Sequence, residues 1–362
     1  MEEGQSIFDY IREHKKTIIL SFLVVAILIF ILGLFAGFEG ILFALEGTDP
    51  YFLVLNFVFE GMILVLWTFR WRLILNLVDE SPKFSSLFLM LLASIFGNNI
   101  TPGAAGGEPL RAYLLFELRG TPFEVGFASS TADRVFEFMP FAIISLLSAI
   151  LIMTWEVSIW TRFIVSFLII FTIVVFSVAI YAGARRDVAQ RIVLGIMKSV
   201  LPFIRNITHR RFEFGNLRDR IIFYVNRFSS GFSMALTDRK VLVIGFLISL
   251  IMWFFDLTRI YICFRTIGVE PPIAPLIIIY TVGILISLLP LLPGSLGLRE
   301  GIIVALFTVT GISADHVMAA SVIDRLASYI TPTFFGFLAA IYYGRIIIRN
   351  HQKNLKEKIY KL

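Results

Sequence analysis

Two Asp-Arg dipeptides lie deep inside apolar stretches of this sequence. Asp133 is 11 residues and Asp324 is 10 residues into its expected helix, which places each about 15 Å from the helix start at 1.5 Å per residue. In a hydrocarbon layer roughly 30 Å thick, a charge at that depth is costly and faces a partner or a wet cavity. Two roles are open for Asp133-Arg134 and Asp324-Arg325: contact with a substrate, or mutual neutralisation between the two halves of the chain. Glu137 is either a protonatable coupling carboxylate or the ion-pair partner of Arg134.

A polar, glycine-containing segment precedes each dipeptide. Free backbone N–H groups and the positive end of the following short helix suit an anionic lipid phosphate, and arginine adds charge and bidentate geometry. The alternative is a tight turn with close helix packing. The predicted substrate-binding residues are Asn98, Asn99, Thr101, Gly103, Gly106, Gly107, Glu108, Arg111, Gly294, Gly297, Arg299 and Glu300.

Several of these polar residues also have simpler explanations. Asn98, Asn99 and Thr101 are expected to satisfy exposed backbone groups first and to touch substrate second. Asp256 and Arg259, three residues apart on one helix face, are expected to pair with each other, whereas Glu60 is a buried acid with no obvious partner.

The elements that position these residues are membrane helices. With 58% apolar and only 16% charged residues, the chain has too little polar surface for a water-soluble globule. A spanning helix needs roughly 20 apolar residues, and apolar runs recur at 17–37, 51–69, 138–153, 159–183 and 241–264. The sequence therefore predicts an all-α, polytopic membrane protein with a single transmembrane domain over residues 1–362.

The basic residues predict the orientation of this domain. If both termini are cytoplasmic, Lys and Arg gather in the inside segments, including the stretch from Arg70 to Lys83. Only Arg162 and Arg265 fall outside. We expect a multi-pass protein of the cell membrane with cytoplasmic N- and C-termini.

An internal repeat relates the two polar segments. Pro102-Gly103 matches Pro293-Gly294, and the spacing from each pair to its Asp-Arg dipeptide is the same. The first copy is expected to enter the membrane from the cytoplasm and the second from outside, so the halves, about 51–183 and 241–345, form inverted repeats, each with a re-entrant helical hairpin. Such symmetry is typical of transporters, in which broken helices meet near the midplane.

A basic segment, residues 185–240, connects these halves. It contains two amphipathic patterns, which suit helices lying on an anionic leaflet or a helical hairpin packed on the protein's own cytoplasmic face.

Several functions are disfavoured by the sequence. The four histidines are scattered, so no metal site is expected, and no GxxxxGK[S/T] loop suggests nucleotide hydrolysis. The net charge of +6 follows membrane topology rather than a nucleic-acid partner. We expect no cofactor and no enzyme activity.

The chain resembles the lysylphosphatidylglycerol synthase transmembrane domain family, the flippase-like domain of bacterial multiple peptide resistance factors. The resemblance rests on NNITPGAAGGEPLRAYLL (residues 98–115), LPGSLGLREG (residues 292–301) and the two Asp-Arg repeats, and it covers residues 15–345. It implies two re-entrant hairpins, movement of a modified phospholipid between leaflets, and functional roles for Glu108, Arg111, Arg299 and Glu300. Because about 17 residues follow the last expected helix, we do not expect the chain to synthesise its own lipid substrate.

These observations predict a flippase-like translocase. It would move an anionic, aminoacylated or glycosylated lipid between leaflets without ATP hydrolysis by this chain. Two alternatives stay open: an intramembrane lipid-modifying transferase with Glu108 or Glu300 as general base, and a membrane partner of a separate glycosyl- or aminoacyltransferase docked on residues 185–240.

Overall fold

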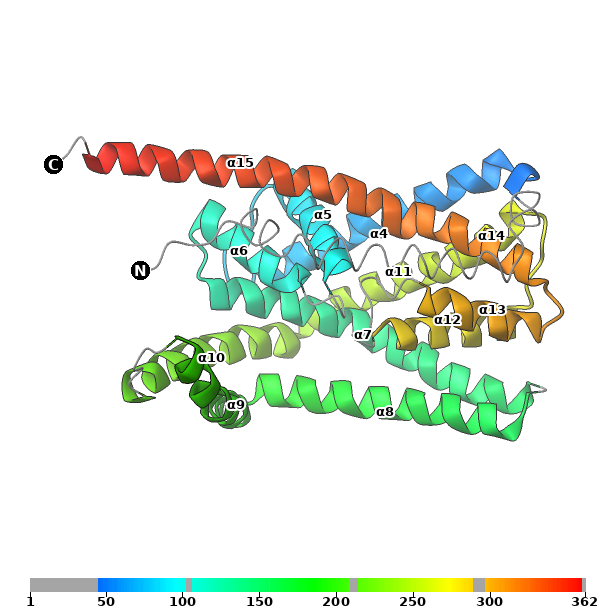
Figure 1. The fold of residues 1–362 in the computed structure, drawn as a ribbon, viewed down its shortest axis with the longest axis horizontal. Helices are drawn as coiled ribbons and strands as arrows, with labels where there is room; N and C mark the ends of the chain where they lie inside the picture. The colour runs from blue at the N-terminus through cyan, green and yellow to red at the C-terminus, as the bar shows by residue number, and fades with distance from the viewer. Residues whose placement is uncertain (1–44, 102–105, 156, 209–213, 289–296, 360–362) are drawn as a thin grey trace.

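The computed structural model describes residues 45–101, 106–155, 157–208, 214–288 and 297–359 (Figure 1). The expected span at 17–37, both Pro-Gly pairs and the predicted site residues Gly103 and Gly294 lie outside these ranges. The described elements are all helices, which confirms the all-α class. They are α4 (Pro50–Leu75), α5 (Phe84–Ile100), α6 (Gly107–Arg119), α7 (Phe123–Thr154), α8 (Ile159–Ala184), α9 (Arg186–Thr208), α10 (Phe214–Thr237), α11 (Arg239–Thr266), α12 (Ile273–Ser287), α13 (Leu298–Thr308), α14 (Ala314–Arg325), the π-helical turn η1 (Leu326–Ile330) and α15 (Thr331–Ile359).

Within the described chain, five helical stretches are long and apolar enough to cross a membrane. These are α4, α7, α8, α11 and the run Ala314–Gln352, which combines α14, η1 and most of α15. Helix α8 shows how the sequence leads to this placement: most of its large apolar side chains are exposed on the protein, a pattern typical of a helix that faces lipid. The protein is a multi-pass membrane protein.

Side-chain caps fix where three of the spanning helices begin. Asp49 accepts a hydrogen bond from the backbone N–H of Tyr51 (2.8 Å), and Asp238 accepts one from Val241 (2.8 Å). Ser158 accepts from Thr161 (3.1 Å). Each cap satisfies an N–H group that has no partner within its own helix, so α4, α8 and α11 start close to the positions that the apolar runs predict.

The two glycine-containing segments each join a pair of short helices. Helix α5 packs on α6, and α12 packs on α13. In Figure 1, α5 and α6 lie toward the end of the molecule that holds α9 and α10, whereas α12 and α13 lie toward the opposite end. The helix breaks are therefore where the sequence predicts them, while the re-entrant depth and the inverted relation stay predictions.

Two close packings involve the long helices. Helix α4 runs along α11, and α5 runs along α15. At the second crossing, a Cβ added to Gly336 would lie 2.2 Å from the backbone oxygen of Leu92, so only glycine fits between these helices.

The basic segment forms the two helices α9 and α10. Helix α10 packs on α7, α8 and α11, and buries Phe232 and Ala235 in a cluster with Ile74 and Ala128. Gln190 of α9 donates to Asn226 of α10 (2.6 Å). The contacts match a helical hairpin on the protein's own face, although Ile192 and Ile196 of α9 stay exposed.

Candidate functional site

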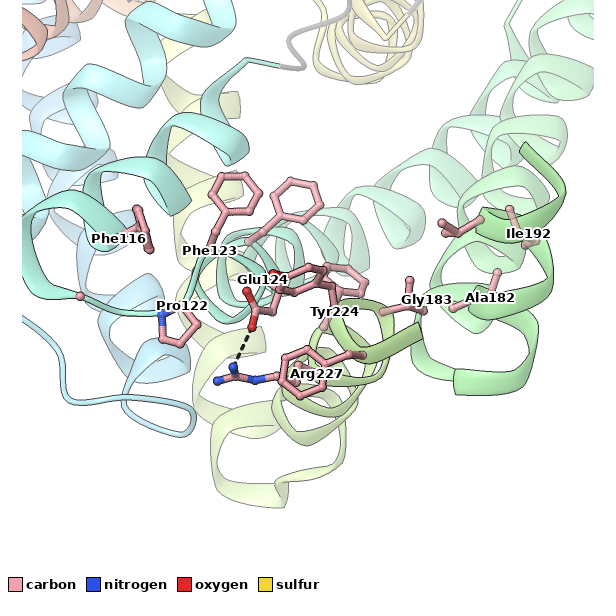
Figure 2. A pocket seen from close by; sticks show the side chains of 16 residues that line it. Phe116, Pro122, Phe123, Glu124, Ala182, Gly183, Ile192, Tyr224 and Arg227 are labelled. Carbon is pink, nitrogen blue, oxygen red and sulfur yellow. Dashed lines mark ion pairs between the residues drawn. The ribbon is translucent and has the colours of Figure 1, made fainter. Parts of the chain in front are cut away.

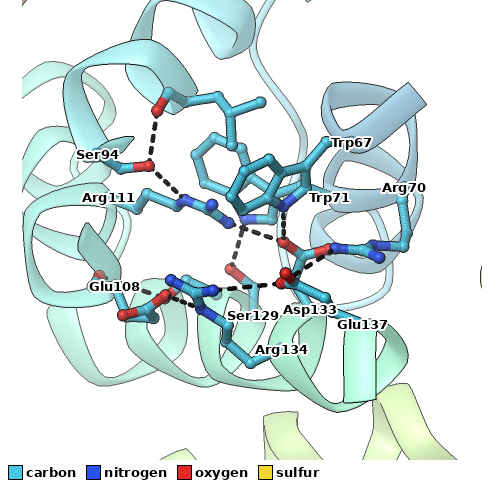
Figure 3. A network of polar contacts seen from close by, with 12 residues as sticks. Trp67, Arg70, Trp71, Ser94, Glu108, Arg111, Ser129, Asp133, Arg134 and Glu137 are labelled. Atoms are coloured by element: carbon cyan, nitrogen blue, oxygen red, sulfur yellow. Dashed lines mark hydrogen bonds and ion pairs between the residues drawn. The ribbon is translucent and has the colours of Figure 1, made fainter. Parts of the chain in front are cut away.

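The first Asp-Arg dipeptide is the centre of a buried ion cluster (Figure 3). Asp133 accepts hydrogen bonds from Arg70 Nε (2.6 Å), Arg111 Nη1 (2.8 Å) and Trp67 Nε1 (2.6 Å). The side chains of Asp133, Arg70 and Arg111 are fully buried. Three helices, α4, α6 and α7, thus meet at one carboxylate.

Arg111 is enclosed on the other sides as well. Its Nε donates to Ser94 Oγ (2.9 Å), and its guanidinium lies 5.0 Å from the ring centre of Trp67 and 4.9 Å from that of Trp71. A carboxylate, a hydroxyl and two aromatic faces compensate the loss of water around this cation.

The arginine of the dipeptide points to different partners. Arg134 Nε donates to Glu108 of α6, and Arg134 Nη1 donates to Glu137 (3.2 Å). Glu137 is thus the ion-pair partner of Arg134, which is one of the two roles that the sequence left open for it. Both Arg134 and Glu137 are about one-third exposed, whereas Asp133 is not exposed at all. The aspartate side chain of the dipeptide is therefore fully enclosed, whereas its arginine side chain is accessible.

The second dipeptide makes a matching set of contacts. Asp324 binds Arg259 of α11 and Arg299 of α13 (3.0 Å), and Arg325 Nε donates to Glu300 (2.6 Å). In each half, the aspartate binds one arginine from the short helix and one from a long helix, while the arginine binds a glutamate of the short helix. Neutralisation between the halves was one expectation for the dipeptides; instead, each aspartate is neutralised within its own half.

A polar cavity lies between the two clusters. It has a volume of about 290 Å³ and receives side chains from α4, α7, α11, α12, α13 and η1. Its polar and aromatic lining consists of Glu60, Trp67, Arg70, Glu137, Trp253, Asp256, Arg259, Tyr280, Ser287, Arg299 and Ser328.

Contacts between α4 and α11 join the halves. Glu60 Oε2 of α4 lies 3.5 Å from Arg259 Nε of α11, and Arg70 Nη1 donates to Ser249 of α11 (2.8 Å). Asp256 pairs with Arg259 (2.7 Å), as their spacing predicted, and accepts a hydrogen bond from Tyr280. Glu60 thus has a partner that the sequence did not reveal.

Acids outnumber arginines in the second cluster. The first cluster balances three arginines with Glu108, Asp133 and Glu137, whereas the second sets Arg259, Arg299 and Arg325 against Glu60, Asp256, Glu300 and Asp324. Paired charges avoid most of the cost of burial in a low dielectric, and the extra carboxyl group can accept a hydrogen bond from a donor in the cavity.

The polar side chains of the first hairpin bind its own backbone. Asn98 accepts from the N–H of Gly107 (2.6 Å), and Thr101 accepts from that of Gly106 (2.9 Å). Asn99 donates to Thr333 of α15 (2.6 Å). Asn98 and Thr101 therefore bind backbone N–H groups, as expected. A phosphate at Gly106 or Gly107 would have to replace these hydrogen bonds.

In the second half, the start of α13 is capped by a side chain of the same helix. Gly297 has a φ of 83°, a left-handed conformation that favours glycine, and its N–H donates to Glu300 (2.7 Å). Arg299 lines the central cavity, whereas Arg111 does not. A phosphate bound by either arginine would share it with Asp324 or Asp133.

The sequence missed most of the cavity. Of the predicted site residues, Glu137 and Arg299 line it, whereas Glu60, Arg70, Asp256 and Arg259 were not assigned there. Arg70 was grouped with cytoplasmic charges, but it is fully buried against Asp133. With Arg72 close by, Arg70 resembled part of a positively charged helix end on the cytoplasmic side. The one sequence signal against that grouping was the apolar stretch that precedes Arg70.

A family model for the lysylphosphatidylglycerol synthase transmembrane region matches residues 18–336. The chain belongs to this family. It is similar to UPF0104 membrane proteins of Methanothermobacter thermautotrophicus, one 65% identical over 95% of this chain and 98% of the relative, another 32% identical over 92% and 96%. A UPF0104 membrane protein of Methanocaldococcus jannaschii is 25% identical over 95% of this chain and 99% of its own length. Membership supports a lipid-related role for this membrane domain.

Proposed function

We propose that this protein moves a lipid head group between leaflets through the central cavity, without ATP hydrolysis by this chain. The observation on which the proposal depends is that two matching ion clusters, one from each half, border one polar cavity inside a bundle of spanning helices. A polar chamber of this kind lowers the cost of moving a head group through hydrocarbon.

The chemistry of the lining supports a modified phospholipid. Arg70, Arg259 and Arg299 offer guanidinium donors to a phosphate. Arg70 Nη2 is buried without a hydrogen-bond partner among the described residues, and it lies 4.0 Å from Glu137 Oε2. Glu60 and Asp256 can accept hydrogen bonds from an amine or hydroxyl. The faces of Trp67, Trp253 and Tyr280 suit a cation or a sugar ring. At about 290 Å³, the cavity fits a head group while the chains stay in the bilayer.

We propose that the end holding α9 and α10 faces the cytoplasm, in a cell membrane. Arg185, Arg186 and Arg191 lie at or near the start of α9, and Arg345 and Arg349 lie on the part of α15 that extends toward the same end in Figure 1. This gathering of arginines supports cytoplasmic termini by the positive-inside rule.

A liposome assay tests the transport proposal. Purified protein is reconstituted with NBD-labelled phosphatidylglycerol, and dithionite reports the labelled lipid that reaches the outer leaflet. We expect faster exchange than in protein-free liposomes. Glu137→Gln is expected to slow it roughly tenfold, equivalent to about 1.4 kcal/mol of barrier. Glu80→Gln, at an exposed residue outside the cavity, is the matched control.

Two results would contradict the proposal. One is exchange at the protein-free rate for both the probe and a native lipid extract. The other is a change in lipid mass when protein and extract are incubated together, because that result would support the lipid-modifying transferase instead.

A further inference from the structure

A second, larger cavity lies away from the ion clusters. It has a volume of about 920 Å³ and is bordered by the end of α6, the start of α7, the end of α8, and α9 and α10 (Figure 2). Most of its lining is apolar or aromatic, with side chains that include Phe116, Phe123, Phe127, Phe223, Tyr224 and Phe228. Its size is within the range of ligand pockets in general, and none of its lining residues borders the central cavity.

The position of this pocket gives it direct access to lipid. Phe116, Phe123, Phe223 and Tyr224 are about half exposed at its edge, although they are large aromatic side chains. Aromatic residues are enriched where a membrane protein meets the interface between hydrocarbon and water. Helix α8, which supplies Ala182 and Gly183 to the wall, presents exposed apolar side chains along the rest of its length. The pocket therefore opens beside a surface that we expect lipid to cover.

One ion pair marks the polar side of the pocket. Arg227 Nη1 of α10 lies 2.9 Å from Glu124 Oε1 of α7, and these are the two charged residues in the lining. Glu124 is mostly buried, whereas the Arg227 side chain is 40% exposed. The guanidinium therefore has an accessible side that can bind a phosphate oxygen while Glu124 holds it in place.

The surrounding charge has the sign that an anionic lipid requires. Arg185, Arg186 and Arg191 lie next to the pocket wall formed by Ala189, Ile192 and Val193, against the single acid Asp187. Basic residues close to the hydrocarbon attract anionic head groups, by about 1 kcal/mol each near the surface of an anionic leaflet.

We propose that this pocket binds one anionic phospholipid, with its chains among the aromatic side chains and its phosphate on Arg227. This binding site goes beyond the proposed transport. It is also placed to supply lipid for transport, because Phe127 in the pocket and Arg134 in the first ion cluster lie on the same helix, roughly 10 Å apart along its axis. Binding itself does not require that transport occur.

Photolabelling tests the site in the full-length protein. Nanodiscs contain phosphatidylcholine and a minor fraction of phosphatidylglycerol that bears a diazirine in one acyl chain, and adducts are mapped by mass spectrometry after irradiation. We expect adducts on the peptides that contain Phe123 to Phe127 and Phe223 to Phe228. Ala182→Trp fills the pocket and should reduce these adducts roughly tenfold, equivalent to about 1.4 kcal/mol of binding. Val178→Trp, one turn earlier on α8 and outside the lining, is the matched control.

A second pair of variants tests the phosphate contact. Arg227→Gln should reduce labelling by the phosphatidylglycerol probe to the level of a phosphatidylcholine probe with the same chains, whereas Arg220→Gln, an exposed arginine outside the lining, should not. Equal labelling of the wild type, Ala182→Trp and Val178→Trp would overturn the proposal. So would a benzoylphenylalanine at position 228 that crosslinks to residues 1–44, because that segment would then occupy the pocket. Each readout is binding, so each is independent of the transport assay.

Discussion

Glu60 of α4 and Arg259 of α11 form an ion pair that connects the two halves of the molecule, with 3.5 Å between Oε2 and Nε. Arg259 also binds Asp256 and Asp324 on its other nitrogens. One guanidinium therefore serves three carboxylates from three helices, whereas Glu60 has this single ion-pair partner among the described residues.

This unequal sharing predicts unequal effects of substitution. Glu60→Gln should lower the free energy of unfolding by no more than about 1 kcal/mol, since Arg259 keeps two stronger partners. Arg259→Gln should lower it by about 3–5 kcal/mol, because it leaves buried carboxylates without a cation. Unfolding in mixed detergent micelles measures both. Equal losses for the two variants would show that Arg259 does not organise this cluster.

The matching contacts of the two dipeptides predict coupling within each half. The pairs Glu108–Arg134 and Glu300–Arg325 should each give a non-additive double-mutant cycle with Gln substitutions, with interaction energies of about 0.5–3 kcal/mol. The double variant should be less destabilised than the sum of its singles, since each single leaves an unpaired charge.

A pair taken across the halves is the control for these cycles. No ion pair between Glu108 and Arg325 is found in the described structure, so Glu108→Gln and Arg325→Gln should add to within about 0.5 kcal/mol. If this pair couples as strongly as the two direct pairs, the clusters respond to overall charge rather than to specific contacts.

The sequence predicted the centres of the clusters but not their partners. Asp133 and Asp324 stand out because an acid in an apolar helix is costly, whatever surrounds it. That Arg70 binds the first and Arg259 the second depends on how α4 and α11 cross α7 and α14, and periodicity along one helix does not determine such a crossing. The helix breaks were predictable for a local reason, because proline and glycine act on their own backbone.

The contact between α5 and α15 predicts a glycine that cannot be replaced. Gly336→Ala should separate the two helices, because the added Cβ would lie 2.2 Å from a backbone oxygen that has no side-chain freedom. We expect a loss of about 1–3 kcal/mol in the free energy of unfolding. Gly61→Ala is the control: a Cβ there meets nothing within 4 Å, and alanine is favoured over glycine inside a helix. A neutral Gly336→Ala would mean that the crossing is looser than the structure shows.

The central cavity predicts a difference in chemical access between two serines. Ser328 lines the cavity, whereas Ser148 is fully buried and shares a hydrogen bond with Thr281 (2.9 Å). In a Cys263→Ala background, Ser328→Cys should react with a charged, membrane-impermeant methanethiosulfonate, because water reaches a cavity lined by ionised groups. Ser148→Cys should not react, because its thiol would be enclosed by packed helices. Applying the reagent to either side of sealed vesicles shows which leaflet the cavity opens to. Equal protection of both cysteines from both sides would mean that the ion clusters are a dry structural core, and a dry core gives a head group no polar route across the bilayer.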